Sequence, residues 1–132
     1  MTTNSLPYSY AVLRIVPHPY TGEAFPVGVV LQSRPAEFIG VKAITDADRL
    51  RALAPEVDIE LLVRYLRSCV AIAEGDETAG DIALLPPPER FHWLTAPRSD
   101  VIQPSAIRYG TTQDPARTLQ LLFEEVVGPS PS

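Results

Sequence analysis

The sequence predicts an α+β fold, in which a small antiparallel β-sheet packs against helices on one of its faces. Two observations support this prediction: residues 8–43 show strand-like alternation of side chains, and residues 45–74 and 114–127 repeat apolar side chains at helical spacing. Strands that precede helices, rather than alternate with them, favour an antiparallel sheet. With 132 residues, of which 45% are apolar, the chain fits one hydrophobic core. We expect a single domain over residues 1–132, ordered from about 7 to 128 between short flexible tails.

The N-terminal third predicts a meander of three antiparallel strands at residues 8–16, 26–33 and 37–43. These segments are rich in β-branched and aromatic residues, and the segments between them contain the Pro and Gly residues of turns. Arg14 falls on an otherwise apolar face of the first strand, because side chains alternate between the two faces of a strand. Gly28, within the second strand, indicates a bulge or the close approach of another backbone.

Two main helices and one short helix are predicted to pack on this sheet. The short helix follows a capping-box pattern at Thr45 and Asp48 and ends before Pro55. The longest helix, at about 58–74, has apolar residues at spacings of three and four. The final helix, at 114–128, starts with an Asp-Pro pair, which is typical of an N-cap and a first helical position, and it stops at a Gly.

Residues 91–110, FHWLTAPRSDVIQPSAIRYG, join the two main helices and match neither a helix nor a strand along their whole length. The three prolines at 86–88 predict an extended backbone that leads into this segment. Its second half, VIQPSAIRYG, is a candidate edge strand, because an edge position tolerates a proline such as Pro104. The expected sheet is therefore the three-strand N-terminal meander with this segment as a further edge strand.

Charge and hydropathy disfavour several classes of protein. A formal net charge of −5 makes nucleic acid an unlikely partner, because phosphate contacts need a positive surface. No apolar run reaches the roughly 18 residues of a membrane span, and the N-terminus lacks the pattern of a secretory signal. A single cysteine, Cys69, agrees with a reducing compartment. We expect a cytoplasmic protein that does not associate with a membrane. An exposed sheet edge could pair with a second copy, so the sequence leaves open whether the protein forms a homodimer.

Motifs of familiar enzyme classes are absent from the sequence. It has no phosphate-binding glycine loop, no Gly-x-Ser-x-Gly elbow and no Cys-x-x-Cys pair. His18 and His92 lack the spacing of metal ligands. Cys69 lies on the apolar face of the longest helix, where burial is favoured over reactivity. We therefore predict no catalytic residue, no metal and no cofactor.

A set of polar residues forms the candidate site: Arg14, Arg98, Ser99, Gln103 and Ser105. Guanidinium groups bind carboxylate or phosphate through two parallel hydrogen bonds, and serine and glutamine add neutral donors. Such a set suits an anionic ligand or an acidic surface of another protein. The same side chains also suit the backbone of a long irregular segment, whose N–H and C=O groups all need partners. The sequence leaves both interpretations open.

Three segments of the chain together match a known pattern: YSYAVLRIVPHPYTGEAFPVGVVL, FHWLTAPRSDVIQPSAIRYG and DPARTLQLLFEEVV. They resemble a bacterial family, domain of unknown function 3037 (DUF3037). The residues that match the family pattern are Tyr10, Arg14, Gly22, Glu23, Val27, Gly28, Val29, Val30, Arg98, Ser99, Gln103 and Pro104, whereas Arg108 stands at a variable position. The resemblance implies no established activity. It implies a kinase-fold partner, because members of the family are often encoded beside kinase-fold proteins similar to persistence-toxin kinases.

Two functional hypotheses follow. In the first, the protein is a non-catalytic accessory or protein-interaction module that regulates a kinase-fold partner. In the second, it is a small enzyme or an anionic-ligand-binding protein that uses the Arg, Ser and Gln motif. The second hypothesis requires Arg14, Arg98, Ser99 and Gln103 to converge on one exposed pocket. We favour the first, because the sequence indicates a stable fold without a recognisable catalytic set.

Overall fold

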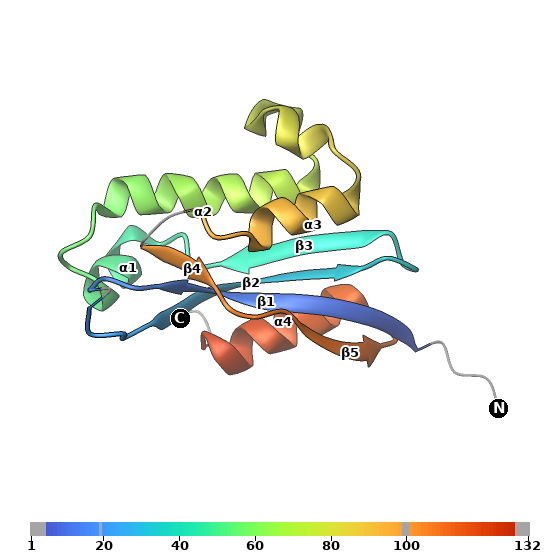
Figure 1. Cartoon of the computed structure of the whole chain (residues 1–132), viewed down its shortest axis with the longest axis horizontal. Coiled ribbons are helices and arrows are strands. Elements are labelled where there is room, and N and C mark those ends of the chain that lie inside the picture. The colour runs from blue at the N-terminus through green and yellow to red at the C-terminus, as the bar shows by residue number, and fades with distance from the viewer. Residues whose placement is uncertain (1–4, 19, 99–100, 129–132) are drawn as a thin grey trace.

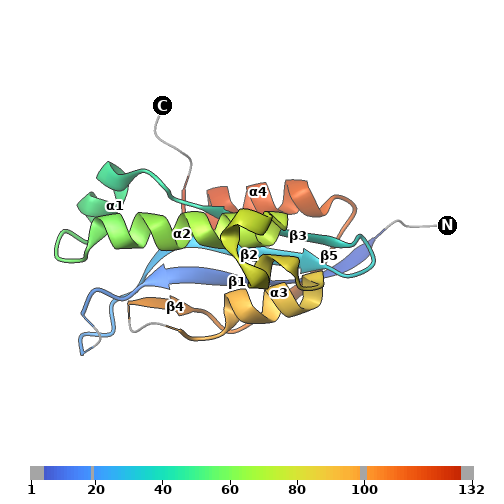
Figure 2. The same ribbon diagram turned by 90° about the horizontal axis from the view of Figure 1, so that it is seen from above.

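The computed structural model describes residues 5–18, 20–98 and 101–128. Within them the chain forms a five-stranded antiparallel sheet with helices on both sides of it (Figures 1 and 2). The antiparallel strands and the separate helices confirm the predicted α+β class. In chain order the elements are β1 (Leu6–Ile15), β2 (Phe25–Ser33), β3 (Phe38–Ala43), α1 (Ala47–Leu53), α2 (Ile59–Glu74), the 3-10 helices η1 (Glu77–Ala79) and η2 (Asp81–Leu84), α3 (Pro87–Thr95), β4 (Ile102–Pro104), β5 (Arg108–Thr112) and α4 (Pro115–Val126).

Strand β1 pairs along both of its edges. One edge pairs with β2, which in turn pairs with β3. The other edge pairs with two short strands in succession, β5 along Leu6–Tyr10 and β4 along Leu13–Ile15. The predicted meander is therefore confirmed, and the predicted edge strand in VIQPSAIRYG is confirmed as β4 and the start of β5.

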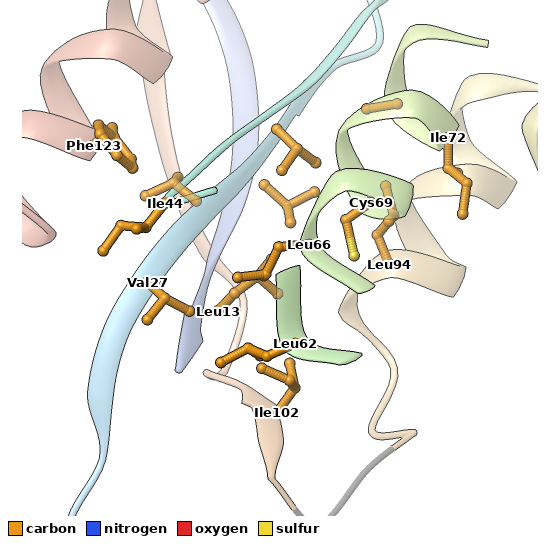
Figure 3. Packing of buried hydrophobic residues seen from close by; sticks show 14 of the residues in the cluster. Leu13, Val27, Ile44, Leu62, Leu66, Cys69, Ile72, Leu94, Ile102 and Phe123 are labelled. Atoms are coloured by element: carbon orange, nitrogen blue, oxygen red, sulfur yellow. The ribbon is translucent and has the colours of Figure 1, made fainter. Parts of the chain in front are cut away.

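Strand β2 is buried on both of its faces. Every residue from Val27 to Ser33 is buried, so the sheet is covered above and below. Figure 3 shows Leu62 and Leu66 of α2 on one side of the strands and Phe123 of α4 on the other. The prediction that helices pack on one face is therefore wrong: α2 and α3 cover one face and α4 covers the other (Figure 1). The continuous apolar run VGVVL is the pattern expected of a strand with two covered faces.

Helix α3 occupies a segment for which we predicted extended backbone. Pro87 and Pro88 form its first turn, where a missing N–H removes no helical hydrogen bond, so the prolines start the helix rather than prevent it. Arg90 then fastens α3 to the end of α2, because its Nη1–H groups donate to the carbonyl oxygens of Ile72 and Ala73 at 3.1 and 2.8 Å. In the described residues α3 thus adds a main helix that the sequence pattern did not indicate.

The predicted helices form with the expected ends, apart from one cap. Helices α2 and α4 begin at the predicted N-caps Asp58 and Asp114, and α2 ends at Gly75 in a left-handed conformation. The start of α1 differs from the prediction, because its N-cap is Asp46 and not Thr45. The Asp46 carboxylate accepts an N–H of the first turn at 3.0 Å, which is a stronger cap than a threonine hydroxyl provides.

Gly28 lies at a point where strands approach closely. The register between β1 and β2 shifts beside it, since Leu13 pairs with Gly28 but Arg14 pairs with Pro26, which confirms the predicted bulge. A Cβ atom at Gly28 would lie 2.9 Å from the carbonyl oxygen of Lys42 on β3. The predicted close approach of another backbone is therefore also present.

Replacement of Gly28 by Ala should lower the free energy of unfolding by about 1–3 kcal/mol, because the new methyl group meets a backbone oxygen that moves only if β3 distorts. Urea denaturation followed by circular dichroism measures the loss. Ser68, which is exposed on α2, supplies the control, and Ser68→Ala should change the free energy of unfolding by less than about 0.5 kcal/mol. A Gly28→Ala protein as stable as the wild type would contradict the tight β2–β3 contact.

Candidate functional site

Arg14 binds the backbone of the neighbouring strand β4. Its Nε–H donates to the carbonyl oxygen of Gln103 at 3.2 Å, and its Nη2–H donates to that of Pro104 at 3.3 Å. Arg14 and Gln103 are direct partners in the β1–β4 register. Two donors of the guanidinium are thus engaged by backbone carbonyl groups of β4, the strand that pairs with its own.

Ser105 continues the hydrogen-bond ladder of β1 between β4 and β5. Its N–H donates to the carbonyl oxygen of Val12 at 2.8 Å, and the Val12 N–H donates in return to Ser105 Oγ at 2.9 Å. The hydroxyl itself donates to the carbonyl oxygen of Ala106 at 3.0 Å. The side chain therefore takes the position of a strand carbonyl, so that the partly buried Val12 N–H keeps an acceptor.

Arg98 follows the end of α3 and stacks on Trp93. Its guanidinium carbon lies 4.1 Å from the centroid of the indole ring, and its Nε–H donates to the Trp93 carbonyl oxygen at 3.0 Å. Its terminal nitrogens make no hydrogen bond or ion pair with a described residue, and the side chain is exposed. Ser99, the next member of the predicted set, lies outside the described residues.

The structure separates Arg98 from Arg14 and Gln103. Side chains alternate along a strand, so Gln103 points away from the face of Ile102, and Arg14 points away from that of Ile15. Ile102 and Ile15 are register partners, and both belong to the buried core. Figure 3 shows Ile102 beside Leu62 of α2. Ile102 also lines a pocket together with Arg98. Arg14 and Gln103 therefore lie on one face of the β1–β4 pair, and the pocket of Arg98 lies on the other.

That pocket, which we call the α2 groove, has a volume of about 470 Å³ and is lined mainly by apolar side chains. Its lining residues are Pro17, Glu56, Val57, Asp58, Leu61, Leu62, Tyr65, Arg98, Val101 and Ile102. Leu61 is 56% exposed. The sequence did not indicate the groove, because Leu61 and Tyr65 widen the apolar face of the predicted helix at 58–74, and such a width predicts burial. The available signal was the width of that apolar face, which exceeds what one core contact needs.

The two carboxylates of the α2 groove are already engaged. Glu56 Oε2 lies 3.0 Å from Nε2 of His18, and Asp58 accepts the N–H of Leu61 at 3.2 Å as the cap of α2. Arg98, by contrast, has terminal donors that no described residue uses. Arg98 is therefore the charged residue of the lining that has hydrogen-bond donors left for a ligand.

Tyr65 and Cys69 form a hydrogen-bonded pair one turn apart on α2. Burial raises the pKa of the Cys69 thiol to about 11, and the hydrogen bond with Tyr65 opposes this rise. Burial, with the Cys69 thiol beside it, raises the pKa of the Tyr65 hydroxyl to about 12, and the positive charge of Arg98 acts in the opposite direction. Both groups are therefore neutral at physiological pH, and Cys69 is a buried thiol rather than a thiolate nucleophile.

Residues 5–18, 20–98 and 101–128 form neither a cluster of metal ligands nor a helix that could span a membrane. No group of three or more His, Cys, Asp or Glu side chains in these ranges is placed to hold a metal ion. No helix in them has the length and apolar character that a membrane crossing requires. The chemistry on offer in the described groove is therefore apolar contact together with the hydrogen bonds and charge of Arg98 and Tyr65.

Comparison with known protein families identifies the family of the chain. A family model described as a protein of unknown function, DUF3037, matches residues 10–127. The matched region runs from β1 to α4 and covers most of the chain, which confirms the resemblance seen in the sequence. No curated protein and no solved structure matches the chain.

Replacement of Ser105 by Ala should lower the free energy of unfolding by about 1–3 kcal/mol, because the Val12 N–H loses its acceptor. Ser105→Thr keeps a hydroxyl and should recover most of the loss. Urea denaturation of the two variants and the wild type measures the difference. Equal stability of the Ser105→Ala and wild-type proteins would show that the hydroxyl does not support the fold.

The free energy of unfolding should fall as the pH rises from about 9 to about 11. The folded-state pKa of Cys69 is raised from 9.0 to about 11, so the stability that the neutral thiol contributes is complete below about 9 and lost as the pH passes 11. Tyr65 acts similarly from about 10 to about 12. Each group adds a slope of up to about 1.4 kcal/mol per pH unit. Urea denaturation at several pH values should give a smaller slope for Cys69→Ala, and an unchanged slope would contradict the burial of the thiol.

Proposed function

Because the chain belongs to the DUF3037 family of proteins of unknown function, we propose a function from its geometry: the protein is a non-catalytic interaction module that binds a segment of a partner protein in the α2 groove. The groove itself supports this proposal, since it combines an apolar lining with a cation whose terminal donors no described residue uses. Concave apolar surfaces with a few placed polar groups are typical of sites that bind peptide segments.

The occupant that fits the groove is a short apolar segment with a carboxylate beside its apolar side chains. The apolar side chains of the segment would pack against the exposed part of Leu61 and the ring of Tyr65, which buries apolar surface of both partners. The carboxylate would bind Arg98 through two parallel hydrogen bonds. The guanidinium is already held by its stacking on Trp93, so it loses little conformational freedom when a ligand binds.

A kinase-fold protein is the partner that we propose to test first. This choice rests on the family resemblance, which implies such a partner. Under the proposal, the kinase-fold protein supplies the apolar and acidic segment. Binding of that segment in the α2 groove changes the activity of the kinase-fold protein. The α2 groove would contribute contacts and no catalytic group.

We place this proposal ahead of a small enzyme or an anionic-ligand site that uses Arg14, Arg98, Ser99 and Gln103. That alternative needs the four side chains to converge on one pocket. Arg14 and Gln103 face away from the α2 groove, and Arg14 already donates to two carbonyl oxygens. Arg98 lines the groove, so the proposed binding role falls on this member of the predicted set.

Leu61→Glu and Arg98→Glu should each weaken binding of the kinase-fold partner by at least about tenfold. Leu61→Glu removes apolar contact area, and Arg98→Glu replaces the charge that attracts the carboxylate with its opposite. Isothermal titration calorimetry with the purified partner measures the two affinities. Both side chains are exposed, so the variants should keep the wild-type fold, which circular dichroism checks.

Leu121→Glu is the matched control. Leu121 is a 49% exposed leucine on α4, which lies on the opposite side of the sheet from the α2 groove (Figure 1). The affinity of Leu121→Glu for the partner should equal that of the wild type. If all three variants bind the partner as tightly as the wild type, the α2 groove is not the docking surface.

A further inference from the structure

A second pocket lies between α3 and the end of the sheet, away from the α2 groove. It has a volume of about 370 Å³, and an adjoining hollow of about 180 Å³ shares part of its lining. The residues that line both are Ser9, Gln32, Arg34 and Tyr109. We call the pocket and the adjoining hollow together the α3–β5 pocket. Figure 2, which looks down on this face, shows α3 lying beside α2.

Strand register places three polar side chains of this pocket in one row. Ser9 of β1 pairs with Gln32 of β2 on one edge and with Tyr109 of β5 on the other. Directly paired residues share a face of the sheet, so the three side chains lie side by side across three strands. Their face is that of Ala11 and Leu13, which follow Ser9 at intervals of two along β1. It is therefore the face that α2 and α3 cover.

Gln32 is a buried polar residue whose side chain has no hydrogen-bond partner among the described residues. Its exposed fraction is 7%, and its amide makes no hydrogen bond to any described residue. Among the described residues, every side-chain nitrogen or oxygen that is sealed from solvent has a hydrogen-bond partner. The Gln32 amide has no such partner, so it is open to the hollow that it lines. The amide is therefore held at the wall of the hollow with its donor and acceptor groups open to whatever fills it, which suggests that it serves a ligand.

The α3–β5 pocket offers a guanidinium and an imidazole to a ligand. Arg34 lines it from the turn after β2, and His92 lines it from α3. Neither side chain has a hydrogen bond or ion pair with a described residue. No Asp or Glu is among the described residues that line the pocket, although the chain as a whole has a net charge of −5. The pocket therefore attracts an anion on an otherwise acidic protein.

We propose that the α3–β5 pocket binds a small phosphate monoester. Arg34, His92, Ser9 and the Tyr109 hydroxyl together offer more donors than the two oxygens of one carboxylate can use, and a phosphate has three acceptor oxygens for them. The Gln32 amide, which donates and accepts, would bind the polar body of the molecule. Phe91 and Pro88 of α3 give that body an apolar wall. This site is independent of the docking proposed for the α2 groove, and neither proposal requires the other.

Titration with ribose 5-phosphate, followed by two-dimensional NMR of the labelled full chain, tests this proposal. We expect saturable shifts of the backbone amides of Ser9, Gln32 and Tyr109 below about 10 mM ligand. Ribose without the phosphate should give no shifts, and inorganic phosphate should bind more weakly than the ester, because it has no polar body for Gln32. Absence of saturable shifts with ribose 5-phosphate, or equal binding of ribose, would overturn the proposal.

Variants at two positions assign the binding to this pocket. Arg34→Gln should weaken ribose 5-phosphate binding by at least about tenfold, and Arg34 is exposed, so the fold should persist. The control is Arg117→Gln, at an exposed arginine of α4, which should bind as the wild type does. Equal losses in both variants would indicate a non-specific charge effect and overturn the site.

Gln32→Leu separates a binding role of the amide from a structural one. Because the amide has no partner within the described residues, its replacement by an apolar side chain of similar size should leave stability unchanged or raise it. Binding of ribose 5-phosphate should fall by at least about threefold. A destabilised Gln32→Leu protein with unchanged affinity for ribose 5-phosphate would show that Gln32 supports the fold, and would remove it from the proposed site.

Discussion

The Ser105 hydroxyl accepts the N–H of Val12 at 2.9 Å and keeps β1 paired where β4 has ended and β5 has not yet begun. Through this contact, residues 102–112 follow β1 as one nearly continuous partner. The same segment connects α3 to α4, so its path determines where both helices lie against the sheet. The α2 groove and the α3–β5 pocket each take a wall from this segment, and both therefore depend on its pairing with β1.

The polar residues that the sequence predicts as one candidate site lie in two separate places in the structure. Arg14 binds carbonyl groups of β4, and Ser105 binds the N–H of Val12 on β1, as expected where a short strand is interrupted and its polar groups need partners. Arg98 lies at the apolar α2 groove and stacks on Trp93. The division follows from strand alternation, because Gln103 and Ile102 are neighbours in the chain and must point to opposite faces.

Sequence patterns predicted the meander, the α2 and α4 helices and the edge strand, because each of these depends on local periodicity and on Pro, Gly and Asp at their ends. They missed α3, since prolines that usually interrupt a helix begin this one. They also placed the helices on one face, although the uninterrupted apolar run of β2 already indicated two covered faces. Neither pocket was predictable, because each one brings together residues from distant segments. Gln32 is an example: its burial depends on strand register and on α3, which the sequence did not indicate.

Amide hydrogen exchange along β1 tests most directly whether the Ser105 side chain completes the ladder. We expect the Val12 amide of the wild-type protein to exchange as slowly as that of Leu13, since both residues lie in the part of β1 that pairs with β2. In Ser105→Ala, the Val12 amide should lose at least about tenfold of its protection while Leu13 keeps most of its own. A Val12 amide that exchanges at the rate of an exposed amide in the wild type, or one that Ser105→Ala leaves unchanged, would contradict the account.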